Sequence, residues 1–154
     1  MPANAPRKLK WAAMTFEEAD KAIKKGELSR LRKELEGGMS PDLANSYSWT
    51  ILMAAAMYGN TQIGRLLIQK GADLNRRNML GDTALSLAVQ TGHSSFVRLL
   101  LKNGASLDCH PHGKSLDIFL DWAAEYCRVT KKQMEHIREL FENERKLRDQ
   151  SPLD

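Results

Sequence analysis

The densest group of potential metal ligands in this sequence is the segment Asp108-Cys109-His110-Pro111-His112-Gly113. It places one thiol and two imidazoles within four residues, and Cys127 follows further along the chain. Zinc prefers these ligand types, but structural zinc sites use ligand pairs about two to four residues apart, joined by a longer arm. No second pair follows here at that spacing. The segment is therefore interpreted as a hairpin tip rich in turn residues, and no metal or other cofactor is expected.

Catalysis is not predicted by any other group of side chains. The sequence contains no nucleophile–base pair at a supporting spacing and no glycine-rich phosphate-binding loop. A trio of His, Asp and Ser can be selected from any chain of this length, so such a trio does not indicate an active site. We expect a protein that is not an enzyme.

Positive charge is the remaining feature that could act directly on a ligand. Lys and Arg number 23 and Asp and Glu 19, for a formal net charge of +4. This balance permits an acidic partner without requiring one. Binding of nucleic acid or another polyanion is thus an alternative function, although an ordinary solvated helix surface explains the same residues. The residues concerned are Arg65, Arg76, Arg77, Arg98, Lys102 and the basic residues of segment 15–44.

Residues 1–14 are predicted to form a disordered basic tail. Arg7, Lys8 and Lys10 are fewer than the roughly five to eight basic residues typical of an import signal or a nucleic-acid patch, which favours a solubilising role. No apolar signal core follows them, and no apolar run approaches the roughly 20 residues that span a bilayer. Two cysteines do not form a disulfide framework. We expect a cytoplasmic or nuclear location without membrane contact.

The elements that would position these side chains follow from a pattern that recurs after 33 residues. The pattern is written twice between Thr50 and Asp108, and the glycines extend it backwards from Gly59 to Gly26 and from Gly71 to Gly38. A repeat of this length predicts a stacked array rather than a single globular core. The pairs separated by this step include Thr50 and Thr83, Leu52 and Leu85, Gly59 and Gly92, and Gly71 and Gly104.

Each unit is predicted to contain two helices. Residues 50–58 are rich in Ala and stop at Gly59, whereas Ile63, Leu66 and Leu67 give a second helix with an apolar stripe. Gly71 ends that helix, because glycine adopts the left-handed conformation without strain. The first helices carry small residues and the second carry Leu, so the stack should curve.

Residues 59–75 and 92–105 resemble the second half of an ankyrin repeat. The segments Thr50-Ile51-Leu52-Met53 and Thr83-Ala84-Leu85-Ser86 keep the Thr and Leu of the family's opening Thr-Pro-Leu-His but lack its Pro and His. The resemblance covers residues 46–108 most strongly. It implies an all-α ankyrin-repeat solenoid of stacked helix pairs with hairpin-like loops, about three to four repeats long, with a C-terminal capping helix. It does not by itself specify a function.

The domain organisation follows from this register. Residues 15–44 are predicted to form a divergent N-terminal capping repeat, opened by a capping box of Thr15 and Glu18. A degenerate repeat and a C-terminal capping helix should close the array, with Thr130 and Gln133 as a second capping box. The predicted units are the tail 1–14, the repeats 15–44, 45–77, 78–110 and 111–129, and the helix and tail 130–154.

The C-terminal part is predicted to contain two further helices. Leu116, Phe119, Leu120, Ala123 and Tyr126 are predicted to form one apolar stripe, with Trp122 alongside. The helix that begins near residue 130 has an apolar face followed by a charged half. It is predicted to cover the open end of the stack; the alternative is that it docks on a partner.

The resemblance implies that another protein binds across the hairpin tips and the concave face of the inner helices. The large apolar candidates fall outside both helical stripes, and aromatics, Met and Arg are enriched in interface centres. The alternative is that Trp49 and Met79 cover hairpin backbone, or that Met57 fills a gap between units. The candidates are Ser46, Tyr47, Trp49, Met57, Tyr58, Arg77, Met79, Leu80, Asp82, Gln90, Thr91 and His110.

We therefore predict a non-catalytic protein–protein interaction module. It would act as a scaffold or adaptor, as an inhibitor that blocks a partner's surface, or as a small subunit of a larger complex. On its own it is expected to be monomeric. Nucleic acid is the less favoured partner.

Overall fold

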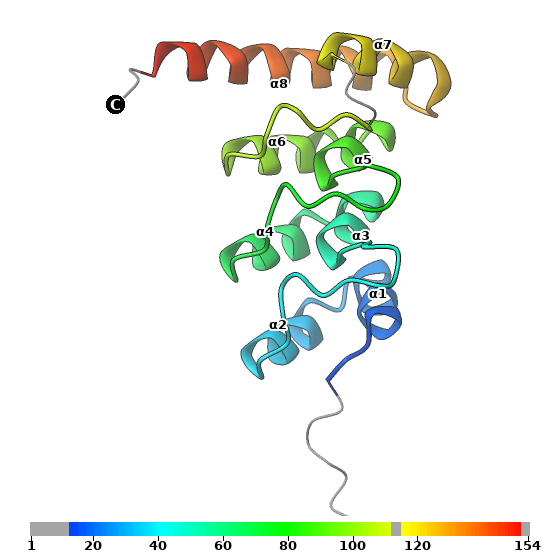
Figure 1. Ribbon diagram of the computed structural model, residues 1–154, viewed down its shortest axis with the longest axis vertical. Coiled ribbons are helices and arrows are strands. Elements are labelled where there is room, and N and C mark those ends of the chain that lie inside the picture. Colours follow the sequence, from blue (N-terminus) through cyan, green and yellow to red (C-terminus); the bar gives the residue numbers. More distant parts are fainter. Residues whose placement is uncertain (1–12, 112–114, 152–154) are drawn as a thin grey trace, which may run out of the picture.

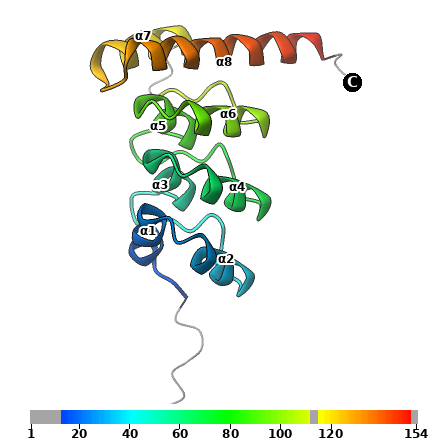
Figure 2. The same ribbon diagram turned by 180° about the vertical axis from the view of Figure 1, so that it is seen from behind.

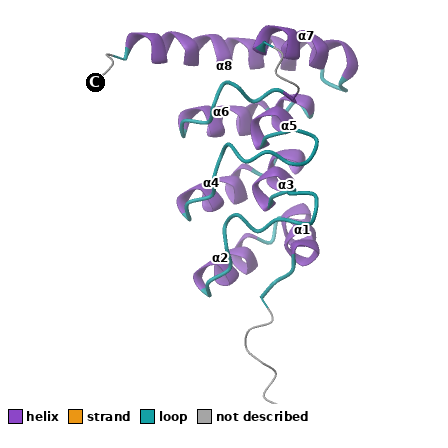
Figure 3. Ribbon diagram, viewed as in Figure 1, coloured by secondary structure: helices purple, strands orange, loops and turns teal. Residues whose placement is uncertain are grey.

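The computed structural model describes residues 13–111 and 115–151. Figure 1 shows that the helices of this part stack in pairs along one long axis, and Figure 3 shows that loops connect them. Within these residues the β pairing is limited to one isolated bridge between Ala44 and Thr50. Most of the predicted basic tail lies outside the described residues. The helices are α1 (Phe16–Lys25), α2 (Leu28–Glu36), α3 (Ile51–Tyr58), α4 (Thr61–Gln69), α5 (Ala84–Gln90), α6 (Ser94–Lys102), α7 (Leu116–Tyr126) and α8 (Lys131–Gln150).

The pairs form two columns, an inner one of α1, α3 and α5 and an outer one of α2, α4 and α6. Each helix packs on its counterpart in the next pair, and both views of the stack show this order (Figures 1 and 2). At the C-terminal end α7 lies over α5, and α8 lies over α6. The predicted all-α solenoid of stacked helix pairs is confirmed.

Threonines begin the inner helices. The Oγ1 atoms of Thr50 and Thr83 accept the backbone N–H of Met53 and Ser86, each at 3.2 Å. Such N-caps contribute about 1 kcal/mol each. The predicted capping boxes at Thr15 and Thr130 are also present. The sequence therefore sets the helix starts through local side-chain-to-backbone hydrogen bonds.

Glycines end the inner helices and contact the next outer helix. Gly59 follows α3 with φ +67°, and a Cβ at this position would lie 2.5 Å from the His93 ring. At Gly92, after α5, the corresponding neighbour is Gln133 of α8, at 3.0 Å. The start of α8 thus occupies the place of the next outer helix in the repeat.

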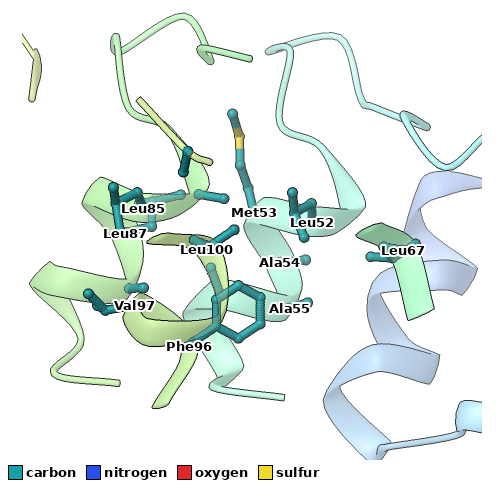
Figure 4. Packing of buried hydrophobic residues seen from close by; sticks show 14 of the residues in the cluster. Leu52, Met53, Ala54, Ala55, Leu67, Leu85, Leu87, Phe96, Val97 and Leu100 are labelled. Carbon is teal, nitrogen blue, oxygen red and sulfur yellow. The ribbon is translucent and has the colours of Figure 1, made fainter. Parts of the chain in front are cut away.

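The core runs continuously through the stack. In α3 every residue from Ile51 to Ala56 is buried, because this helix lies between neighbours on three sides. Figure 4 shows Leu52, Ala54 and Ala55 of α3 beside Phe96 of α6 and its neighbours. Neither helix of a pair can bury its apolar residues without the adjacent pair.

The C-terminal helices add a longer layer. The side chains of Met134, Ile137 and Phe141 are buried on α8, which packs on α6. Two ion pairs connect α8 to α7: Arg138 Nη2 lies 2.6 Å from Asp121 Oδ1, and Arg145 Nη1 lies 3.4 Å from Asp117 Oδ1. No helix within the described residues is long and apolar enough to cross a membrane.

One residue of the predicted α7 stripe is placed wrongly by the sequence. Leu116, Phe119, Leu120 and Ala123 are buried as expected, but Tyr126 is 67% exposed. Tyr126 is the last residue of α7, which packs on α5 and α8 through its other apolar positions.

Candidate partner-binding surface

The hairpin tips of two successive repeats present large apolar side chains. Tyr47 and Leu80 are each 67% exposed and Met79 is 70% exposed. The Met79 N–H donates to the Tyr47 carbonyl at 3.0 Å, so the two tips are in direct contact. We call Tyr47, Met79 and Leu80 the apolar ridge. Its exposure cannot be attributed to loose loops, because both tips are hydrogen-bonded.

Asparagine side chains shape the tips. Asn45 Oδ1 accepts the N–H groups of Tyr47 and Trp49, each at 3.0 Å. Asn78 Oδ1 accepts those of Leu80 and Asp82 at 2.9 and 3.0 Å. These side-chain-to-backbone bonds fix the turn geometry. The backbone of both tips is therefore fixed in a conformation that leaves the ridge side chains exposed.

Arg77 connects one tip to the next. Its guanidinium donates to the carbonyls of Gly81 at 2.7 Å, His110 at 3.1 Å and Asp108 at 2.6 Å. Most of its donors are thus used within the stack. The side chain positions the hairpins, although the sequence placed it among the partner contacts.

Two other predicted contacts are buried. Asp82 and His110 are each only 8% exposed, so they are far less accessible than the apolar candidates at the tips. Asp82 Oδ1 accepts from Ser86 Oγ at 3.0 Å and from Gln90 Nε2 at 2.8 Å. His110 Nε2 lies 3.3 Å from Asp108 Oδ1. Asp82 is thus bonded to helix α5, and His110 pairs with a residue of its own hairpin.

The predicted residues near α3 form a second group. Trp49 is half-buried and packs on the core, while Met57 and Tyr58 are exposed at the end of α3. The Tyr58 hydroxyl donates to both carboxylate oxygens of Asp20 at 3.2 Å, and burial together with the Asp20 charge raises its pKa. These side chains line a shallow groove of about 280 Å³.

Of the remaining candidates, Ser46 is exposed at a tip and Thr91 is half-buried at the end of α5. The Thr91 hydroxyl donates to the Leu87 carbonyl at 2.7 Å, so it forms its hydrogen bond within the end of α5. The structure therefore divides most of the candidates into two groups. One consists of exposed apolar residues, and the other of residues whose side chains form hydrogen bonds within the stack.

A larger groove adjoins the apolar ridge. It has a volume of about 490 Å³ and runs from the second hairpin tip to α7. Its lining is mainly apolar and contains one carboxylate. The lining residues are Met79, Leu80, Asp82, Gln90, Pro111, Phe119 and Trp122.

Sequence reasoning missed the contribution of α7 to this groove. The rings of Phe119, Trp122 and Tyr126 follow one another at centroid distances of 6.1 and 6.3 Å, and Ile118 and Trp122 are exposed. The available signal was the spacing of Ile118, Trp122 and Tyr126 at i, i+4 and i+8. This spacing defines a second apolar face beside the buried one.

Two of the arginines in the alternative hypothesis lie on the outer column of helices. Arg65 belongs to α4 and Arg98 to α6, on the outer column. Arg98 Nη2 lies 3.2 Å from His136 Nε2 of α8. The arginines that recur with the repeat thus belong to different elements from the apolar ridge.

The segment that resembled a zinc motif lies only partly within the described residues. Cys109 is buried, and this burial raises the pKa of its thiol to about 12, so the sulfur is protonated at neutral pH. Zinc binds the thiolate. His112 lies outside the described residues, and among the others no three His, Cys, Asp or Glu side chains are grouped as metal ligands would be.

Stacked helix pairs joined by projecting hairpins define a helical-repeat protein. Residues 20–111 match the family described as ankyrin repeats in three copies, which is more than half of the chain. The chain belongs to the ankyrin-repeat family. Ankyrin repeats are typically protein-binding modules and are usually not catalytic.

Relatives in other organisms share this repeat region. The chain is 33% identical over 64 residues to ankyrin repeat-containing protein P1E11.10 of Schizosaccharomyces pombe, covering 42% of this chain and 31% of that protein. It is 36% identical over 74 residues to ankyrin repeat, SAM and basic leucine zipper domain-containing protein 1 of Carollia perspicillata, covering 46% of this chain and 16% of that protein. The aligned region therefore spans less than a third of either relative.

Proposed function

We propose that this chain is a non-catalytic module that binds another protein through its hairpin tips and the concave face of its inner helices. The observation that carries the proposal is the apolar ridge, in which Tyr47, Met79 and Leu80 remain about two-thirds exposed on hydrogen-bonded tips. Contiguous exposed apolar groups on an ordered surface are typical of interaction sites. The ridge leads into the larger groove, so a partner could contact both.

A double variant at the tip tests this proposal. Met79→Ser with Leu80→Ser removes two-thirds of the ridge without touching a buried residue. We expect recovery of captured proteins from a lysate of the source organism to fall by roughly tenfold or more, because anchors of this kind contribute about 2 kcal/mol or more. Quantitative mass spectrometry of the captured proteins measures the change.

The matched control is Leu147→Ser, which also removes an exposed leucine but lies on α8. It should leave both the captured proteins and the thermal midpoint unchanged. Equal recovery with the tip variant and the control would show that the ridge does not bind the partner. A large drop in the thermal midpoint of the tip variant would instead assign the ridge a structural role.

A further inference from the structure

Charge is divided unevenly between the two columns of helices. Helices α3, α5 and α7 contain no Lys or Arg, and α7 contributes Asp117, Asp121 and Glu125, although α1 of the inner column carries lysines balanced by as many acidic residues. The outer helices α2, α4 and α6 carry basic residues in excess of their acidic ones, so the positive net charge of the chain does not describe the helices beside the groove. The basic residues of α2, α4 and α6 are Arg30, Arg32, Lys33, Arg65, Arg98 and Lys102.

The charged group of the larger groove is negative. Among its described lining residues Asp82 alone is ionisable, and this residue is 8% exposed. Ser86 and Gln90 donate to Oδ1, whereas no hydrogen bond from residues 13–111 or 115–151 reaches Oδ2. Arg77 forms its ion pair with Asp108, at 3.7 Å. A largely buried carboxylate gains most from a charged donor.

The apolar part of the groove suits the stem of the same side chain. Trp122 is partly exposed and lines the groove together with Leu80 and Met79. An indole face attracts a guanidinium or ammonium group, and long basic side chains bury their methylenes on apolar surface. The smaller groove repeats this composition, with Asp20, Trp49 and Met57 in its lining.

We propose that the larger groove binds a segment of the partner protein in which an arginine or lysine is flanked by apolar residues. The cation lies between the Asp82 carboxylate and the Trp122 ring, and the flanking residues contact Met79 and Leu80. This inference rests on the proposed function and specifies its partner. The net charge of the chain, which only permits an acidic partner, does not indicate this preference for a basic one.

Degenerate peptide pools test the inference without a known partner. Short fluorescein-labelled peptides carry one fixed central residue, which is Arg, Lys, Gln or Glu, and random apolar residues on both sides. Fluorescence polarisation measures their affinity for the full chain at one moderate salt concentration. We expect the Arg and Lys pools to bind roughly tenfold more tightly than the Gln pool, as for a charge-assisted hydrogen bond, and the Glu pool to bind most weakly.

Three variants assign the effect to the groove. Asp82→Asn keeps an oxygen for Ser86 and Gln90 but removes the charge, and it should reduce the Arg and Lys pools to the affinity of the Gln pool. Trp122→Leu preserves apolar surface, and it should weaken the Arg and Lys pools more than the Gln pool. Asp121→Asn removes one exposed charge of α7 outside the groove and should leave the preference intact.

The inference is overturned if the Glu pool binds as well as the Arg pool, if the preference survives Asp82→Asn, or if Asp121→Asn abolishes it equally. Failure of every pool to bind also overturns it. If these results occur while Met79→Ser with Leu80→Ser still prevents partner capture, the proposed function stands without this specificity. If that tip variant captures the partner normally, the proposed function itself fails.

Discussion

Helices α4 and α6 approach each other at Gly64, where a side chain is absent for a steric reason. A Cβ at this position would lie 2.6 Å from the Phe96 ring. Phe96 is completely buried, so its ring has no open space into which to move. Glycine is a poor helix former, yet here it permits the spacing between two repeats.

Substituting Gly64 should therefore destabilise the stack. Gly64→Ala is expected to lower the free energy of unfolding by about 1–2 kcal/mol, because overpacking exceeds the gain in helix propensity. Urea denaturation followed by circular dichroism measures the change. Gln62→Ala, exposed on the same helix, should change stability by less than about 0.5 kcal/mol.

A double-mutant cycle with Phe96→Leu tests the contact itself. The smaller residue makes room for the new methyl group, so the double variant should lose less stability than the two single variants together. Simple additivity, or a Gly64→Ala protein as stable as the wild type, would contradict the close approach.

At the scale of elements, α8 combines two roles that a sequence pattern cannot separate. Its first half is the outer helix of the last pair, with Met134, Ile137 and Phe141 buried. Its second half is more polar and extends along α6, where Arg148 Nη2 donates to the Ala105 carbonyl at 2.9 Å. These contacts favour a covering role over a free docking helix.

Truncating a buried α8 residue should reveal how much stability this cover supplies. Ile137→Ala is expected to lower the free energy of unfolding by about 2–4 kcal/mol, since Ile137 is completely buried. Chemical denaturation measures the change, and Leu147→Ala on the exposed half serves as the control. Equal stability of both variants would indicate that α8 is held only weakly and favour the docking alternative.

At the scale of the whole molecule, stability should vary along the stack because each pair contacts only its neighbours. Helix α2 buries Leu31 and Leu35 alone, whereas α4 and α6 each bury four residues and lie between two layers. The N-terminal pair has a neighbour on one described side only. Opening should begin there.

Hydrogen exchange followed by mass spectrometry tests this order. Peptides from α2 should exchange before those from α4 and α6, because local opening of an end pair exposes fewer buried groups. The comparison of α2 with α4 is internal and needs no variant. Exchange of α4 ahead of α2 would contradict a stack whose stability is set by neighbouring contacts.

The sequence by itself determined the repeat, the helix limits and the exposed tips. Thr50 and Thr83 begin helices, and Gly59 ends one, through interactions with residues a few positions away. Tyr47, Met79 and Leu80 are exposed because they occupy tips rather than helical stripes. Each of these features depends on residues close together in the sequence. Their recurrence at a regular interval makes the repeat recognisable from the sequence.

Only the tertiary structure decided how the polar candidates and α7 are used. Asp82 and Arg77 resemble surface residues in the sequence, but one is buried against α5 and the other joins carbonyls as far away as His110. Trp122 completes the groove because α7 is placed beside the second hairpin tip. These outcomes depend on contacts between repeats. The sequence pattern of one repeat does not predict which of its side chains the next repeat covers.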